Sequence, residues 1–185
     1  VVGGGGLISL PALMFSGLSP SAAVATNKLA SSMGSLTSTI TFYRSGKLDL
    51  KSVLKYVPFV FICSIIGAWI VHLLDPNLLK PLMLIMLAVV AVYTILKKDW
   101  GGISGVKKLS KPKYILFFIF FSFIGFYYGF LGPGTGSFLI FAFLMVGYDF
   151  LKAAGNAKLL NLTSNVGALL MFLYLGQVNF TYGII

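Results

Sequence analysis

The chain contains no glutamate, a single cysteine and a single histidine among its 185 residues. Only 10% of the residues are charged, whereas an average soluble domain has about 25%. Cys63 cannot form an intrachain disulfide and is expected to be a small core residue, and His72 is expected near the end of a helix. The sequence has no Ser/His/Asp set, no cluster of metal ligands and no GKS/T phosphate-binding motif. We therefore expect neither an enzyme nor a cofactor.

The acidic residues that are present all fall in predicted loops or at predicted helix ends. They are Asp49, Asp75, Asp99 and Asp149. A buried carboxylate that could carry a proton or a sodium ion is not visible, and a cationic substrate would lack its counter-charge. A binding site in this chain should therefore prefer anions.

Apolar residues make up 58% of the sequence, and the mean hydropathy is +0.96. The clearest apolar runs are residues 56–74, 78–96 and 114–131, and a helix of roughly 20 apolar residues crosses a bilayer. The composition predicts an all-α, polytopic membrane protein whose surroundings are a lipid bilayer.

The net charge is +10, and the basic residues gather in two connecting segments, at residues 44–55 and 97–113. Basic residues concentrate in the cytoplasmic loops of membrane proteins, and two predicted crossings separate these segments. Both segments are therefore expected on the cytoplasmic side, and nucleic acid is not expected as a partner.

The helices expected around these segments have recognisable starts. Residues 3–18 are too short to cross a bilayer comfortably, since sixteen helical residues reach about 24 Å. Ser19 followed by Pro20 has the pattern of an N-cap and a first helical residue, and the helix should continue to about Tyr43. Asp149 should cap a second long helix that ends near Leu175.

An internal repeat appears when the sequence is aligned with itself so that Gly4 falls on Gly134. The identical pairs in this register are Gly4 and Gly134, Gly6 and Gly136, Ala12 and Ala142, Gly17 and Gly147, Ala23 and Ala153, Lys28 and Lys158, Leu29 and Leu159, Phe42 and Phe172, and Gly46 and Gly176. Apolar identities are common in such a composition, but four glycines and a lysine in one ungapped register indicate a duplication. Transporters often bind substrate near the midplane where such repeats meet.

We expect a first transmembrane repeat at residues 1–97 without its opening helix, a basic cytoplasmic loop at 98–113, and a truncated second repeat at 114–185. The chain is expected to be incomplete at both ends. The segment after the first long helix is basic, whereas its counterpart at 175–179 is uncharged, which favours inverted repeats. Inversion is expected to require residues 132–147 to help complete a crossing instead of turning back.

The two glycine motifs, at residues 3–6 and 132–136, each precede a short apolar segment. Each of these segments is expected to form a short broken or re-entrant helix. Helix N-termini present unpaired N–H groups and partial positive charge, and glycine lets the backbone approach an anion closely. Each motif is followed by a lysine in apolar sequence, Lys28 or Lys158, and a charge within a span by default marks a pathway. Tight packing of the glycines and snorkelling of the lysines are the alternative readings.

Polar side chains share the helical faces of these lysines, at three and seven residues further along the chain. The expected substrate-binding residues are Gly4, Gly6, Asn27, Lys28, Ser31, Gly134, Gly136, Asn156, Lys158, Asn161 and Asn165. Their amides and hydroxyls could donate to a small oxyanion, or could instead hydrogen-bond between helices.

Four stretches resemble the signature motifs of the TauE/SafE sulfite exporter family, in particular its YfcA-like membrane proteins. They are GGGGLISLP at 3–11, ATNK at 25–28, GFLGPGTGSF at 129–138 and NAKLLNLTSN at 156–165. The resemblance covers almost the whole chain and implies a prokaryotic inner-membrane permease for sulfite, organosulfonates or related sulfur oxyanions. One departure is Tyr128, where the family often has an acidic residue, which puts ion coupling through that position in doubt.

The sequence thus predicts a multi-pass secondary transporter in a prokaryotic cell membrane that binds a small sulfur-containing anion between two repeats. An anion channel and a non-transporting structural or assembly protein stay open as alternatives, and so does a homo-oligomer.

Overall fold

A computed structural model describes residues 5–96 and 111–184. Every regular element in this part of the chain is an α-helix, as the composition predicts. The elements are α1 (Gly5–Phe15), α2 (Pro20–Arg44), α3 (Leu50–Val53), α4 (Val57–Leu73), α5 (Pro76–Leu96), α6 (Lys111–Phe130), α7 (Thr135–Val146), α8 (Phe150–Tyr174) and α9 (Phe180–Ile184). Gly4 and most of the predicted basic loop at 98–113 lie outside the described residues.

The two longest helices, α2 and α8, begin as their sequences predict. The Ser19 side chain accepts a hydrogen bond from the backbone N–H of Ala22, and Pro20 follows it. The Asp149 side chain accepts one from the backbone N–H of Lys152 at 3.0 Å. Each cap satisfies one of the N–H groups that a helix start leaves unpaired.

The helix boundaries follow the register of the sequence repeat. Helices α1 and α7 start at matching positions, and α2 and α8 match at both ends, with 25 residues each. The chain also turns at matching glycines. Gly17 and Gly147 have φ angles of 93° and 102°, and Gly46 and Gly176 have 64° and 65°. Glycine adopts this left-handed conformation without the steric cost that other residues meet.

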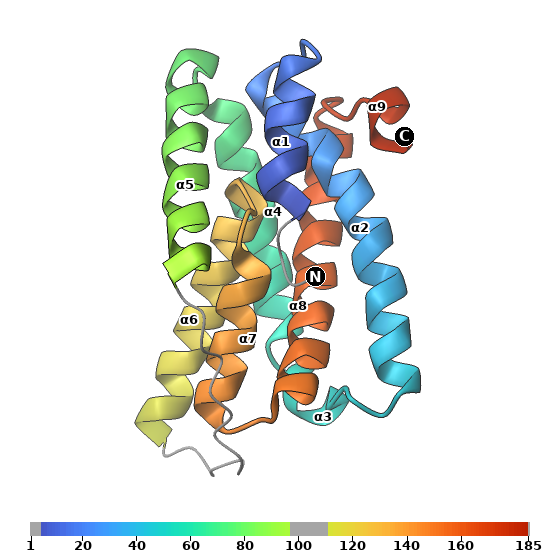
Figure 1. The fold of residues 1–185 in the computed structure, drawn as a ribbon, viewed down its shortest axis with the longest axis vertical. Coiled ribbons are helices and arrows are strands. Elements are labelled where there is room, and N and C mark those ends of the chain that lie inside the picture. The colour runs from blue at the N-terminus through green and yellow to red at the C-terminus, as the bar shows by residue number, and fades with distance from the viewer. Residues whose placement is uncertain (1–4, 97–110, 185) are drawn as a thin grey trace.

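Matching segments run in opposite directions. In Figure 1, α2 descends from the upper end to the lower end, whereas α8, packed against it, ascends. Helix α1 starts near the middle and rises, and α7 starts near the middle and descends beside α6. The expectation that an inverted arrangement needs residues 132–147 to help complete a crossing is therefore wrong. The chain turns back after α6, where Gly132 and Gly134 have positive φ angles.

Close backbone contact joins α4 to α6. A Cβ atom on Gly125 would lie 2.9 Å from the Val60 carbonyl oxygen, and one on Gly129 would overlap the Ser64 backbone. From the other side, a Cβ atom on Gly67 would overlap the backbone of α6 at Phe126. Small residues spaced four apart permit this approach in membrane helices. With α8 on its other side, α4 forms the back wall of the bundle.

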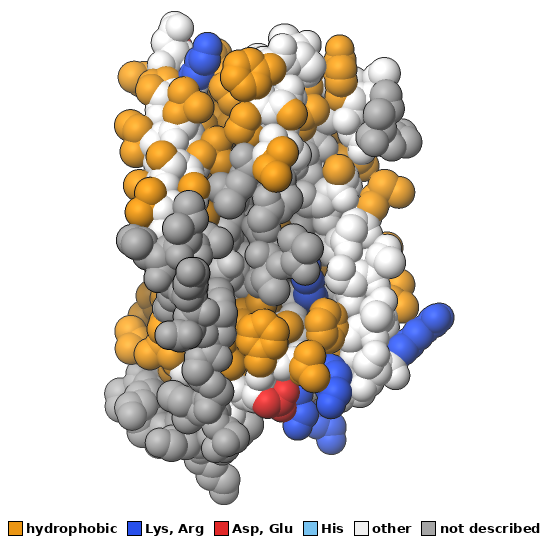
Figure 2. Space-filling model, in the orientation of Figure 1, with side chains coloured by type: hydrophobic (Ala, Val, Ile, Leu, Met, Phe, Trp, Pro, Cys, Tyr) orange, Lys and Arg blue, Asp and Glu red, His pale blue; other side chains and the backbone are white. Residues whose placement is uncertain are grey.

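The outer surface is largely apolar. Large hydrophobic side chains such as Ile8, Phe15 and Tyr174 are strongly exposed, and Figure 2 shows apolar side chains over much of the visible face. Basic side chains gather at the lower end of that view, where α2 ends and α8 begins. Within residues 5–96 and 111–184, no helix meets the combined length and apolarity expected of a membrane span.

Candidate anion-binding site

A cavity of about 320 Å³ lies where the two halves of the chain meet. Its walls come from α1, α2, α6, the turn after α6, α7 and α8. The lining residues are Gly6, Asn27, Lys28, Ser31, Gly34, Ser35, Ser38, Tyr128, Gly132, Thr135, Gly136, Lys158 and Asn161. Glycine, amide, hydroxyl and lysine groups dominate this lining, and no acidic residue contributes to it.

The two glycine motifs come together at the cavity. A Cβ atom on Gly6 would lie 3.6 Å from the Cα atom of Pro133, within ordinary van der Waals contact. The starts of α1 and α7 therefore meet, and Gly6 and Gly136 line the cavity beside them. A helix start carries about half a positive charge, so both helix termini favour an anion here.

Lys28 is the most deeply buried charged group in the described part of the chain, with a side chain only 1% exposed. Its ammonium donates a hydrogen bond to the backbone carbonyl of Tyr128 and lies 4.2 Å from the centre of that tyrosine ring. A Cβ atom on Gly132 would approach the ammonium to 2.5 Å. Lys28 makes no ion pair with any described residue. Among these residues, only the carbonyl dipole and the ring face of Tyr128 stabilise its charge.

Lys158 reaches the same cavity from α8 and is half-buried. Its ammonium makes no hydrogen bond or ion pair with residues 5–96 or 111–184. The acidic residues described there, Asp49, Asp75 and Asp149, lie at helix ends or in turns, outside the lining. A half-buried lysine without a partner beside a fully buried one leaves the cavity with uncompensated positive charge, which an anion would neutralise.

A polar network supports one wall of the cavity. The Tyr128 hydroxyl donates to Oδ1 of Asn161 at 2.6 Å, and the Asn165 amide donates to the same atom at 2.8 Å. The Asn165 amide also donates to the Tyr128 hydroxyl at 3.1 Å. Asn161 lines the cavity, whereas Asn165 is fully buried behind it. Asn165 therefore orients Asn161 and Tyr128 and does not face the cavity.

Asn27 contributes to the cavity lining beside the start of α1. Its side-chain oxygen accepts a hydrogen bond from the Ser9 hydroxyl at 2.6 Å. This contact leaves the amide nitrogen of Asn27 on the side of Gly6, where a Cβ atom on that glycine would lie 3.8 Å away. The carbonyl of Asn27 is thus occupied, and its amide is oriented as a donor near the start of α1.

The structure brings most of the predicted site residues together. Those that line the cavity are Gly6, Asn27, Lys28, Ser31, Gly136, Lys158 and Asn161. Gly134 caps α7 with its Cα facing Val90 of α5, Asn165 lies behind the wall, and Asn156 lies elsewhere. Gly4 is outside the described residues.

Sequence reasoning did not include several lining residues among the predicted site, notably Ser35, Tyr128, Gly132 and Thr135. Ser35 had a usable signal, because it lies seven residues after Lys28 on the same helical face. The sequence marks Tyr128 only as a departure from the family motif. No local pattern predicts its contact with Lys28, because that contact spans 100 residues and depends on how α6 packs against α2.

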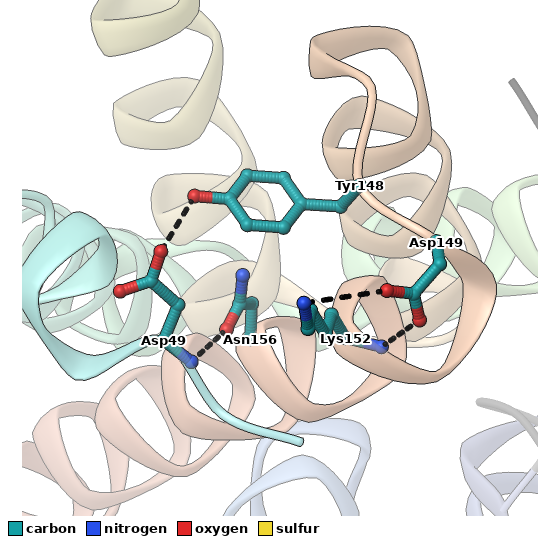
Figure 3. A network of polar contacts seen from close by, with 5 residues as sticks. All are labelled: Asp49, Tyr148, Asp149, Lys152 and Asn156. Carbon is teal, nitrogen blue, oxygen red and sulfur yellow. Dashed lines mark hydrogen bonds and ion pairs between the residues drawn. The ribbon is translucent and has the colours of Figure 1, made fainter. Parts of the chain in front are cut away.

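Asn156 belongs to a different network, at the basic end of the molecule (Figure 3). Its Oδ1 accepts a hydrogen bond from the backbone N–H of Asp49 at 2.8 Å, and the Tyr148 hydroxyl donates to Asp49 Oδ2 at 3.0 Å. Partial burial acts to raise the pKa of Asp49, but hydrogen bonds from Ser52 and Tyr148 and the nearby Lys152 charge together hold it below its ordinary value. Asp49 is therefore a carboxylate at neutral pH.

The cavity thus has the character of a site for a small anion in a helical protein. The family model described as "Sulfite exporter TauE/SafE" matches residues 1–185, and the chain belongs to this family. The resemblance expected from the four sequence motifs is confirmed.

The chain is similar to bacterial proteins named as membrane transporters. It is 36% identical over 186 residues to "Probable membrane transporter protein YfcA" of Escherichia coli strain K12. This alignment covers all of the present chain and 68% of the Escherichia coli protein. It is 34% identical over 187 residues to "Probable membrane transporter protein" of Haemophilus influenzae, an alignment that covers 100% of this chain and 72% of that protein. A Sinorhizobium protein, "Probable membrane transporter protein ORF9", is 33% identical over 186 residues, an alignment that covers 100% of this chain and 70% of that protein. No solved structure gives a significant match.

Proposed function

We propose that the protein is a secondary transporter that spans the inner or plasma membrane of a prokaryote several times. Its substrate is sulfite, an organosulfonate or a related small sulfur-containing anion, bound between two inverted repeats near the bilayer midplane. The family description and the names of the relatives support the transporter class. The apolar exposed surface supports the membrane location.

One observation carries the choice of an anion. Lys28 and Lys158, at matching positions of the repeat, line one cavity that has no acidic residue in its lining. Two cationic groups partly removed from water are costly unless a counter-charge joins them. A sulfonate or sulfite group offers three oxygens, and the lysines, the Asn27 and Asn161 amides and the helix starts would supply donors for them.

The opposite directions of α2 and α8 support alternating exposure of that cavity. When matching halves are inverted, a rocking motion that closes one end opens the other, and the substrate site stays fixed between them. Because the cavity lies where the starts of α1 and α7 meet, both halves would move around the bound anion.

Transport in proteoliposomes tests the proposal. Sulfite flux should be strongly reduced in Lys28→Ala and in Lys158→Ala, because each change removes one of two charges that hold the anion. Lys80→Ala is the matched control, since Lys80 is an exposed lysine that lines a separate apolar groove beside α1, and its flux should be unchanged. Normal flux in both cavity variants would show that the anion site is elsewhere.

A thermal-shift panel of sulfite, sulfate, thiosulfate, taurine and sulfoacetate would identify the substrate class. We expect sulfur-containing anions to raise the melting temperature of the parent protein and to lose that effect in the cavity variants. Conductance that fails to saturate with anion concentration would instead indicate a channel.

A further inference from the structure

One inter-repeat contact occurs twice, once at each end of the molecule. At the basic end, the backbone N–H of Asp49 donates to the side chain of Asn156 at 2.8 Å. At the other end, the backbone N–H of Asn179 donates to the Thr26 hydroxyl at 3.1 Å. Asp49 and Asn179 occupy matching positions of the repeat, and so do Thr26 and Asn156. Each contact therefore joins the start of a short helix, α3 or α9, to the long helix of the other repeat (Figure 1).

The contact at the basic end is reinforced by side chains. Asp49 Oδ2 accepts a hydrogen bond from the Tyr148 hydroxyl at 3.0 Å (Figure 3). The same oxygen accepts one from the Ser52 hydroxyl at 2.7 Å. The Tyr148 side chain is 5% exposed, and its ring packs edge-on against Phe143 at 5.8 Å. Tyr148 therefore ties Asp49, on the first repeat, to the corner between α7 and α8, on the second.

The backbones also approach each other closely at this end. A Cβ atom on Gly155 would overlap the carbonyl oxygen of Lys47, so the turn after α2 rests directly on the backbone of α8. The position that matches Gly155 in the first repeat is Ala25, which carries a Cβ atom. The two ends therefore differ in backbone packing as well as in hydrogen bonds.

The matching contact at the opposite end lacks this reinforcement by a tyrosine and a serine hydroxyl. Asn179 Oδ1 accepts only from the backbone N–H groups of Thr181 and Tyr182, which belong to its own short helix, as far as the described residues show. The residue that matches Tyr148 is Leu18, which lines the same shallow hollow as Asn179 and has no hydroxyl to donate. The matching contact is therefore a single neutral hydrogen bond. A separate hydrogen bond from the Gln177 amide to the His72 ring, at 2.6 Å, also joins the repeats near this end.

We infer that Asp49, Tyr148 and Asn156 form a latch that holds the two repeats together at the basic end, so that opening the cavity toward that end requires the latch to break. Asn156 precedes Lys158 by two residues and lies nearer the start of α8, so the latch lies between the cavity and the basic end. The inference rests on the proposed function, because a latch has this role only in a protein that exposes its cavity alternately.

Cysteine accessibility in membrane vesicles tests the latch without any substrate. Ser35 lines the cavity and is 4% exposed, so Ser35→Cys in a Cys63→Ser background reports on opening. Tyr148→Phe removes the hydroxyl and keeps the ring. A hydrogen bond to a charged acceptor is strong enough that its loss should speed labelling by an impermeant maleimide, added on the basic side, about tenfold.

Lys152→Gln is the matched control at neutral pH, because the Lys152–Asp149 ion pair at 3.8 Å is about half exposed on both partners and lies in the same region. The Lys152 charge acts on Asp49 only by lowering its pKa, and Asp49 is a carboxylate at neutral pH with or without it. Exposed pairs contribute little, so its labelling rate should equal the parent rate. Asp49→Asn keeps the shape of the side chain at the start of α3 and should speed labelling in the same direction as Tyr148→Phe.

Labelling of Tyr148→Phe and Asp49→Asn at the parent rate would overturn the latch. So would equal acceleration by Lys152→Gln, which would indicate general loosening of this end. Because the readout contains no anion, failure of the lysine variants to impair sulfite flux would contradict the proposed substrate site and leave the labelling result to be judged separately.

Discussion

The two matching halves of the molecule, α1–α3 and α7–α9, share their helix starts and turn glycines but differ in their polar contacts. Lys28 is fully buried and donates to the Tyr128 carbonyl, whereas Lys158 is half-buried and has no partner among the described residues. At the ends of the molecule, the Asp49 carboxylate accepts a hydrogen bond from a hydroxyl of the other repeat, whereas the Asn179 side chain does not. The two halves therefore share a backbone arrangement but use different side chains for their polar contacts.

The difference suggests a division of labour between the lysines. The ammonium of Lys28 is fixed by the carbonyl and ring of Tyr128, so it contributes a stationary positive charge to the cavity. The ammonium of Lys158 is free to turn toward an incoming anion. Under the proposed function, Lys158 of the second repeat would be the direct partner of the anion, and Lys28 of the first repeat would set the potential of the site.

The largest expected effect separates the two lysines. Lys158→Met should lower sulfite affinity about 100-fold, because it leaves the bound anion without its direct partner, and should change the melting temperature little. Lys28→Met should lower affinity less. It should raise the melting temperature, because an apolar side chain of similar length replaces a buried charge that has no counter-ion. Calorimetric titration and thermal unfolding measure the two quantities, and equal affinity losses with equal stability changes would remove the proposed division.

A smaller effect is expected from Gly132, a glycine that lines the cavity. Gly132 and Gly17 both have φ angles of 93°, but only Gly132 has the Lys28 ammonium where a Cβ atom would stand. Either change to alanine should destabilise the protein by about 1–2 kcal/mol through left-handed backbone strain.

Only Gly132→Ala should also lower anion affinity, severalfold, by displacing Lys28. Gly17→Ala is its matched control, since nothing lies within 4 Å of a Cβ atom there. Anion affinity that falls equally in both variants would mean that the loss comes from destabilisation and not from the position of Lys28.

The smallest expected effect concerns pH, to which the end that carries Asp49 should respond because the matching residue at the other end is the neutral Asn179. The pKa of Asp49 is below its ordinary value with the latch formed, so the deprotonated form favours the latch, and acid weakens it. Tyr148 and Lys152 are the ionisable groups that act on Asp49. The raw labelling rate of Ser35→Cys falls with pH because the thiolate is the reactive form, so the quantity to compare is the ratio of this rate to the rate in the Asp49→Asn variant. This ratio should be constant from neutral pH downward and should rise only below about pH 3.9. Comparison with Asp49→Asn at each pH corrects for the reactivity of the thiol, and a rise that persists in this variant would assign the response to another group.

Much of the fold could be predicted locally. Ser19, Pro20 and Asp149 mark helix starts because capping depends on neighbours within three residues, and the glycine pairs mark turns because their backbone conformation is intrinsic to the residue. The direction of α7 could not be predicted, because either a crossing or a turn satisfies the same apolar pattern.

The candidate site was predictable only where helical spacing decides it. Lys158 and Asn161, three residues apart, reach the same cavity. Asn156 is only two residues from Lys158, yet that spacing places it about 200° around the helix, where it meets Asp49 instead. Lys28 and Tyr128 are joined by a turn and a helix packing that no local pattern contains.

The sequence by itself determined the helical class, the caps, the repeat register and the absence of acidic residues from the apolar segments, because each depends on residue type and short spacing. The tertiary structure alone decided that the two glycine motifs meet, that Tyr128 holds Lys28, and that Asp49 reaches Tyr148 and Asn156. These contacts join segments that lie far apart in the sequence. They depend on the direction and packing of helices, which arise only when distant segments bury their surfaces together.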